Sequence, residues 1–140
     1  MPRSAAKNAP PAKSVRGNPE TILQGKIMDA LGLLPGVIVW RNAVGTAVYE
    51  SGARVEYGVG GPGAPDLFCT VLFRGLSIAL YLEVKTPDDG VVKPHQRQWH
   101  AAERRGGNNV AVIRSIADAL AVVAEVQQHG RVVSAWEVAA

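Results

Sequence analysis

The chain has 140 residues, 47% of them hydrophobic, with one cysteine and a formal net charge of +3. This length and hydrophobic content suit one compact domain with its own core and exclude a wholly disordered protein. A lone cysteine excludes an internal disulfide and a multi-cysteine metal cluster, which fits a reducing compartment.

The positive charge is concentrated at the start of the chain. Four of the 15 basic side chains lie within residues 1–18, which carry no acidic one, and this leaves 11 basic against 12 acidic side chains elsewhere. Residues 1–18 are also rich in proline and alanine, so we expect a disordered basic tail followed by one domain over residues 19–140. Neither a secretory signal nor a membrane span of about 20 apolar residues is recognisable, and we expect a cytoplasmic protein with no membrane partner.

The first half of the chain predicts a helix and three strands. A helix should begin at Asn18-Pro19, with asparagine as N-cap and proline at the first helical position, and run to about Leu33. The β-branched run at residues 36–42 predicts a strand, and residues 46–50 and 53–57 predict two short strands joined by a turn.

Residues 58–65, GVGGPGAP, predict a loop. They satisfy the pattern G-x-G-x-x-G, but in a dinucleotide site this pattern opens a helix. Here it leads through Pro65 into another strand. We therefore interpret the segment as a flexible loop that lets a substrate backbone approach closely.

The second half predicts a hairpin, then helix, strand and helix. Residues 66–73 and 76–85 should pair around Arg74-Gly75. Helices are predicted from Lys93-Pro94 to about Arg105 and over residues 116–129, separated by a strand at residues 109–114, and residues 131–138 predict an edge strand. This order predicts an α/β fold with a mixed sheet flanked by helices.

The predicted hairpin brings charged side chains together. A symmetric turn at Arg74-Gly75 places Asp66 directly opposite Glu83, with Lys85 on the same face, while the opposite face is wholly apolar and should pack on helices. Carboxylates opposed at about 5 Å repel each other. Three things could offset this repulsion: Lys85 alone, a proton shared between the carboxylates, or a Mg²⁺ or Mn²⁺ ion, which prefers hard oxygen ligands.

The remaining motifs have simpler interpretations. His95, His100 and His129 lack metal-binding spacing, and we expect them on the surface. Trp99 could stack on a nucleic-acid base, but its place in an amphipathic helix favours the core.

The segments GAPDLF and LYLEVKTP together resemble the bipartite signature of the PD-(D/E)XK nuclease superfamily. The surrounding segments VWRNAVG, KPHQRQWHAAERRGG and VAVIRSIADAL resemble its VRR-NUC branch, so that the resemblance covers roughly Glu20 to Leu120. This branch occurs in phage and bacterial replication and repair proteins and as a module of larger eukaryotic repair nucleases. The resemblance implies a restriction-endonuclease-like mixed sheet and a DNA endonuclease that depends on Mg²⁺ or Mn²⁺.

The resemblance also implies roles for individual residues. Asp66, Glu83 and the Val84 carbonyl would bind the metal, and Lys85 would contact the attacking water or the scissile phosphate. Gln96 matches the glutamine of the branch and would position water. The first-helix acid of the branch corresponds to Glu20, which would be a further catalytic residue and metal ligand, or could equally serve as an ordinary partner of the helix dipole.

Single-domain members of this branch resemble Holliday-junction resolvases, which implies branched DNA as substrate, a homodimer, and a role in DNA repair and recombination in a bacterial or phage-infected cell. Basic side chains that could track phosphates are Arg41, Lys93, Arg97 and the pair Arg104-Arg105. Two alternatives stay open. One is a nicking or flap nuclease in phage replication or packaging, and the other is a non-catalytic DNA-binding protein on the same fold.

Overall fold

The computed structural model describes residues 18–43 and 45–139. The predicted basic tail, apart from Asn18, lies outside the described residues. The helices are α3 (Pro19–Gly32), α4 (Pro94–Arg105) and α5 (Ile116–His129). The strands are β1 (Val37–Arg41), β2 (Gly45–Val48), β3 (Arg54–Tyr57), β4 (Leu67–Phe73), β5 (Leu76–Val84) and β6 (Asn109–Ile113). No helix in the described ranges is long and apolar enough to span a bilayer.

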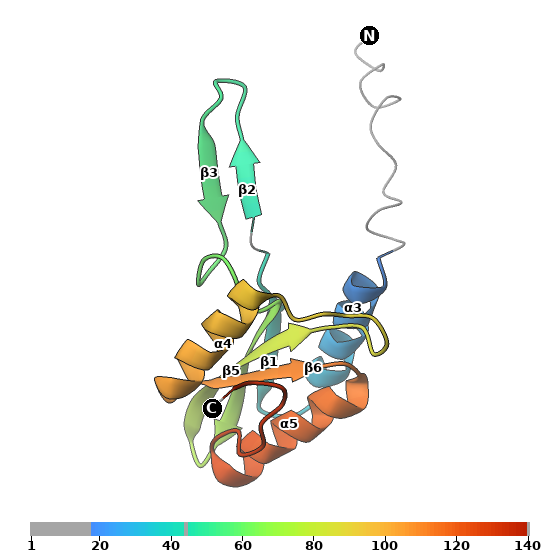
Figure 1. The fold of residues 1–140 in the computed structure, drawn as a ribbon. Helices are drawn as coiled ribbons and strands as arrows, with labels where there is room; N and C mark the ends of the chain where they lie inside the picture. Colours follow the sequence, from blue (N-terminus) through green and yellow to red (C-terminus); the bar gives the residue numbers. More distant parts are fainter. Residues whose placement is uncertain (1–17, 44, 140) are drawn as a thin grey trace.

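Four of the strands form a mixed sheet in the order β1-β4-β5-β6, with β6 parallel to β5 and the other pairs antiparallel. Helices α3 and α5 cover one face, where Ile27, Leu31 and Val122 pack against the sheet, and α4 lies over the other face (Figure 1). Strands β2 and β3 form a separate two-stranded sheet. The predicted α/β fold with a mixed sheet is therefore confirmed.

The β4–β5 hairpin has the predicted register. Leu67 pairs with Leu82 and Phe73 with Leu76, across a turn in which Arg74 and Gly75 both have positive φ, 48° and 79°. Such left-handed turns match the natural twist of hairpin strands. Most of the apolar face is buried as expected: Leu67, Leu80 and Leu82 are fully inaccessible, whereas Leu76 next to the turn is 62% exposed. Continuing the same register by one residue places Asp66 opposite Glu83.

The helices begin as the sequence predicts. The Asn18 side chain accepts hydrogen bonds from the N–H groups of Glu20 and Thr21, at 3.0 and 3.3 Å. Ser115 Oγ accepts one from the Asp118 N–H, at 3.0 Å. These caps satisfy N–H groups that have no partner within the helix.

The predicted edge strand at residues 131–138 is wrong. Trp136 and Glu137 have φ values of 49° and 61°, which are incompatible with a strand. Instead of a neighbouring strand, the Glu125 carboxylate on α5 accepts hydrogen bonds from the N–H groups of Val133 and Ser134. A carboxylate distant in sequence thus replaces the expected ladder and holds the segment in an irregular path.

Arg104 on α4 holds this C-terminal segment against the sheet. Its guanidinium donates to the backbone carbonyls of Val110, Ser134 and Ala135 at 2.9–3.2 Å. Arg104→Met should lower the free energy of unfolding by about 1–3 kcal/mol, because these three backbone carbonyls lose their charged hydrogen-bond donor. Urea denaturation checks this, with Arg105→Met at the exposed neighbouring position as control. Equal losses in the two variants would contradict this role.

Candidate active site

Asp66 and Glu83 meet at the end of the β4–β5 hairpin. Asp66 lies immediately before β4, and its Oδ2 accepts a hydrogen bond from the Val84 N–H at 2.9 Å. Glu83 is fully buried. Its two carboxylate oxygens are inaccessible and have no hydrogen-bond partner among the described residues. A buried carboxylate without donors is costly, so this oxygen pair needs a proton or a cation.

The electrostatics of this pair lead to the same requirement. Burial, followed by the adjacent Glu83, raises the pKa of Asp66 to about 8. Burial also raises the pKa of Glu83, even though the charge of Lys85 acts in the opposite direction. Lys85 alone therefore does not compensate the two carboxylates. Of the three offsets considered from the sequence, a shared proton and a bound cation remain.

Lys85 and Glu20 lie beside the carboxylate pair. Lys85 is 5% exposed, and its Nζ lies 3.9 Å from Glu20 Oε2. Glu20 reaches this position because it occupies the first turn of α3. Burial raises the pKa of Glu20 more than the nearby Lys85 lowers it. Both roles considered from the sequence are therefore open to Glu20, because it lies in the first turn of α3 and also next to Lys85 in the site.

Gln96 lies between two hollows at this edge of the sheet. One hollow, of about 250 Å³, is lined by Gln96 and Asp66, and the other, of about 450 Å³, is lined by Gln96, Glu20 and Lys85. Gln96 Oε1 accepts the Lys93 N–H at 2.9 Å, which fixes the side chain at the start of α4. The structure therefore brings the predicted residues together at one edge of the sheet: Asp66, Lys85, Gln96 and Glu20 line these two adjoining hollows, which we call the polar cleft, and Glu83 is buried beside Asp66.

His100 is a site residue that the sequence interpretation missed. We expected it on the surface, but it is 1% exposed, and its Nε2 lies 3.7 Å from Glu83 Oε1. Burial, followed by the charge of Lys85, lowers its pKa to about 4, so the ring is neutral at physiological pH. His100 follows Gln96 by one helical turn, and this spacing was the available signal, because such residues share a helix face.

Asn42 is the second residue that was missed. It is 8% exposed, and its side chain donates to the carbonyls of Val59 and Pro65 and accepts the Val59 N–H, at 2.9–3.1 Å. Its own N–H donates to the Asp66 carbonyl at 2.7 Å. Asn42 therefore fixes the glycine-rich loop and the start of β4 relative to β1. These contacts attach the predicted loop at Val59 and Pro65, near its two ends.

Asn42→Ala should destabilise the chain by about 3 kcal/mol, because it leaves the buried Pro65 carbonyl and the part-buried backbone groups of Val59 without these partners. Cleavage should fall as well, since the loop next to Asp66 loses its attachment. Thermal unfolding measures the first effect. The control is Asn108→Ala, which removes only an exposed contact with Glu103, and a stability loss no larger than that of this control would contradict the role of Asn42.

The predicted basic residues have different surroundings. Arg41 and Lys93 are exposed, and Lys93 borders the larger hollow. Arg97 is exposed too, but it donates to the Val92 carbonyl at 2.6 Å. Trp99 is partly buried against Tyr81 and donates to the Gly60 carbonyl at 2.9 Å, which confirms its place in a core.

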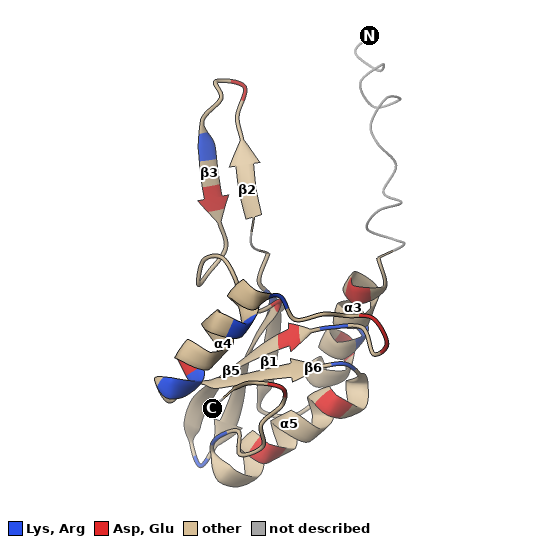
Figure 2. Ribbon diagram, in the orientation of Figure 1, with Lys and Arg blue, Asp and Glu red and all other residues tan. Residues whose placement is uncertain are grey.

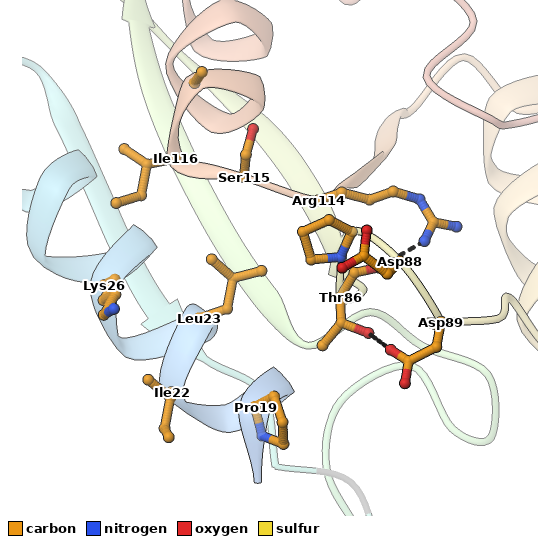
Figure 3. Close-up of a pocket in the computed structure, with 12 residues that line it drawn as sticks. Pro19, Ile22, Leu23, Lys26, Thr86, Asp88, Asp89, Arg114, Ser115 and Ile116 are labelled. Atoms are coloured by element: carbon orange, nitrogen blue, oxygen red, sulfur yellow. Dashed lines mark hydrogen bonds between the residues drawn. The ribbon is translucent and has the colours of Figure 1, made fainter.

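A further hollow of about 630 Å³ lies between α3, the turn after β5 and the start of α5 (Figure 3). It is lined largely by apolar side chains such as Ile22, Leu23 and Ile116, and none of the predicted metal ligands lines it. Arg114 donates to the Thr86 carbonyl at 2.8 Å and so fixes the turn between this hollow and the polar cleft. Chemistry, rather than size, therefore identifies the carboxylate cleft as the candidate site.

The donor set at the cleft fits Mg²⁺ or Mn²⁺ bound together with a substrate. Within residues 18–43 and 45–139, no three His, Cys, Asp or Glu side chains form a ready metal cage. Mg²⁺, however, typically takes one or two protein carboxylates and completes its shell with water and substrate phosphates. Asp66 and the unpartnered oxygens of Glu83 supply such a pair.

Comparison with known proteins gives one informative likeness. No family model and no curated protein matches the chain. Among solved structures, a chain described as "VRR_NUC domain" is similar, with 27% sequence identity and a TM-score of 0.51. The likeness covers 79% of this chain and 95% of that one, so it extends over most of both.

Proposed function

We propose, on the premise that this chain has the VRR-NUC fold, that it is a DNA endonuclease dependent on Mg²⁺ or Mn²⁺. The likeness to a VRR-NUC domain supports a nuclease that binds DNA. The observation that carries the proposal is the fully buried Glu83, whose carboxylate oxygens lack a hydrogen-bond partner among the described residues, beside the partly buried Asp66, which lines the smaller hollow, and Lys85, which lines the larger one.

The arrangement supplies what phosphodiester hydrolysis requires. Asp66 and Glu83, with the Val84 carbonyl, would hold the metal. When bound, Mg²⁺ or Mn²⁺ supplies Lewis acidity and lowers the pKa of water. The Lys85 ammonium would donate to the charge that develops on the scissile phosphate. The Gln96 amide, fixed by its bond to the Lys93 N–H, would orient the attacking water.

Neighbouring residues would support these roles. Glu20 would hold the Lys85 ammonium at the cleft, and the neutral His100 ring would exclude water from one side of Glu83. Arg41, Lys93 and Arg97 would contact DNA phosphates around the cleft, contributing affinity without sequence preference.

We further propose that the substrate is branched DNA and that the enzyme acts as a homodimer, as in Holliday-junction resolvases. The support is the resemblance to single-domain members of the branch. A nicking or flap nuclease and a non-catalytic DNA-binding protein are the competing proposals.

Cleavage of three labelled substrates with Mg²⁺ separates these proposals: a four-way junction, a flap and a linear duplex of matched length. Junction resolution predicts paired, symmetrical cuts, with the junction cleaved at least about tenfold faster than the duplex, a difference of about 1.4 kcal/mol. Faster cutting of the flap would favour the first alternative. Binding of all three without any cleavage would favour the non-catalytic one.

A further inference from the structure

Residues 45–57, with strands β2 and β3 and the turn between them, form a ribbon that we call the arm. It extends away from the four-stranded sheet (Figure 1). Large apolar side chains of the arm are exposed, including Val48 at 63%, Val55 at 46% and Tyr57 at 50%. An isolated two-stranded hairpin is marginally stable in water, and clustered exposed apolar side chains indicate an interaction surface. We therefore expect contact with a partner to stabilise the arm.

The outer edge of β3 is available for strand pairing. The Tyr49 N–H donates to the Ala53 carbonyl, and the register continues through Val48 opposite Arg54 and Ala47 opposite Val55. Bonded and non-bonded pairs alternate in an antiparallel ladder. The backbone groups of Val55 therefore face β2, whereas those of Arg54 and Glu56 face outward. An exposed edge of this kind is a template for a further strand.

The sequence of this edge is complementary to itself. If two copies of β3 pair antiparallel around a two-fold axis at Val55, Arg54 lies opposite the partner's Glu56, and Glu56 lies opposite the partner's Arg54. In this register the outward-facing backbone groups meet one another, as a ladder requires. A shift by two residues in either direction would oppose Arg54 to the partner's Arg54, or Glu56 to the partner's Glu56. Like charges directly opposite destabilise a sheet, so one register is favoured.

The charge of the arm favours a second copy of the chain over DNA as its partner. Its charged side chains are Glu50, Arg54 and Glu56, and Figure 2 shows that β3 itself carries one basic and one acidic residue. A net negative ribbon does not suit a phosphate backbone, whose binding depends on Lys and Arg.

We propose that the arm is a self-association surface, on which β3 of one protomer pairs with β3 of a second copy around Val55 to give a continuous four-stranded ribbon. This assignment does not depend on nuclease activity. One consequence does rest on the proposed function: because the 58–65 loop connects the arm to Asp66, pairing would hold two cleavage sites at a fixed separation.

Charge reversal tests the register. Sedimentation analysis at low salt, without DNA or metal, would compare the wild type with Arg54→Glu, Glu56→Arg and the double variant. Each single change should raise the dimer Kd about tenfold, because it creates two like-charge pairs per dimer. The double variant restores opposite pairs and should return to within about threefold of the wild type. Across the ladder of the arm itself, Arg54 faces Val48 and Glu56 faces Thr46, so none of the changes creates a directly opposed like-charge pair inside one protomer.

The exposed position Arg131 provides the control, since Arg131→Glu should leave the Kd unchanged. A monomeric wild type at about 100 μM, or a double variant as weak as the single variants, would overturn the proposal. A dimeric wild type that shows the charge-swap rescue but cuts no DNA would support the arm and contradict the nuclease, so the two failures are distinguishable.

Discussion

Asp66→Asn should reduce Mg²⁺-dependent cleavage of DNA by about 10³-fold while leaving the chain folded. The amide matches the carboxylate in size and can still accept the hydrogen bond from the Val84 N–H. It carries no charge for a cation, so the change removes the chemistry and keeps the packing. Because burial already disfavours the ionised form of Asp66, the melting temperature should stay the same or rise.

Asp88→Asn is the matched control for this variant, because Asp88 is an exposed acid in the turn after β5 and lies outside the carboxylate pair. Nicking of supercoiled plasmid, followed over time on a gel, gives the rates. Asp88→Asn should cleave like the wild type. If Asp66→Asn retained more than a tenth of the wild-type rate, Asp66 could not be a metal ligand.

Lys85→Met should lower the cleavage rate by about 10²-fold. Lys85 is nearly inaccessible, so its ammonium group lies where the effective dielectric constant is low. Its charge therefore interacts more strongly with a nearby phosphate than it would in water. Methionine keeps most of the side-chain length and suits a buried position. The residual cleavage should still require Mg²⁺, since both carboxylates remain, and this distinguishes the variant from Asp66→Asn.

The control for Lys85 is Lys26→Met, a change at an exposed lysine on α3. Single-turnover cleavage of a saturating substrate separates the chemical step from DNA binding. Equal losses in the two lysine variants, or a loss for Lys85→Met only in DNA affinity, would show that Lys85 acts as a general phosphate contact.

Much of the fold could be predicted because its signals are local. The β4–β5 register follows from a two-residue turn at Arg74-Gly75 and from strict alternation, which together leave one arrangement with a buried apolar face. Helix boundaries follow from the caps Asn18 and Ser115. The opposition of Asp66 and Glu83 is a direct consequence of this register, and so the centre of the site was predictable as well.

The parts that could not be predicted depend on contacts between distant segments. His100 is buried because α4 covers the charged face of the hairpin; its spacing from Gln96 indicates a shared helix face but not this packing. Asn42 acts through the carbonyls of Val59 and Pro65, and residues 131–138 leave the strand conformation because Glu125 replaces a strand as their partner. In the last two cases a single polar side chain outside the segment overrides the local preference.

We propose that Asp66 and Glu83, with a divalent cation, carry out the hydrolysis of DNA. The most direct test is cleavage of a labelled four-way junction by the purified wild-type chain, in Mg²⁺ and in EDTA, on one gel. We predict paired cuts in Mg²⁺, and in EDTA a rate lower by at least about 10³-fold, the scale of removing transition-state charge stabilisation. Cleavage at the same rate in EDTA would contradict the claim.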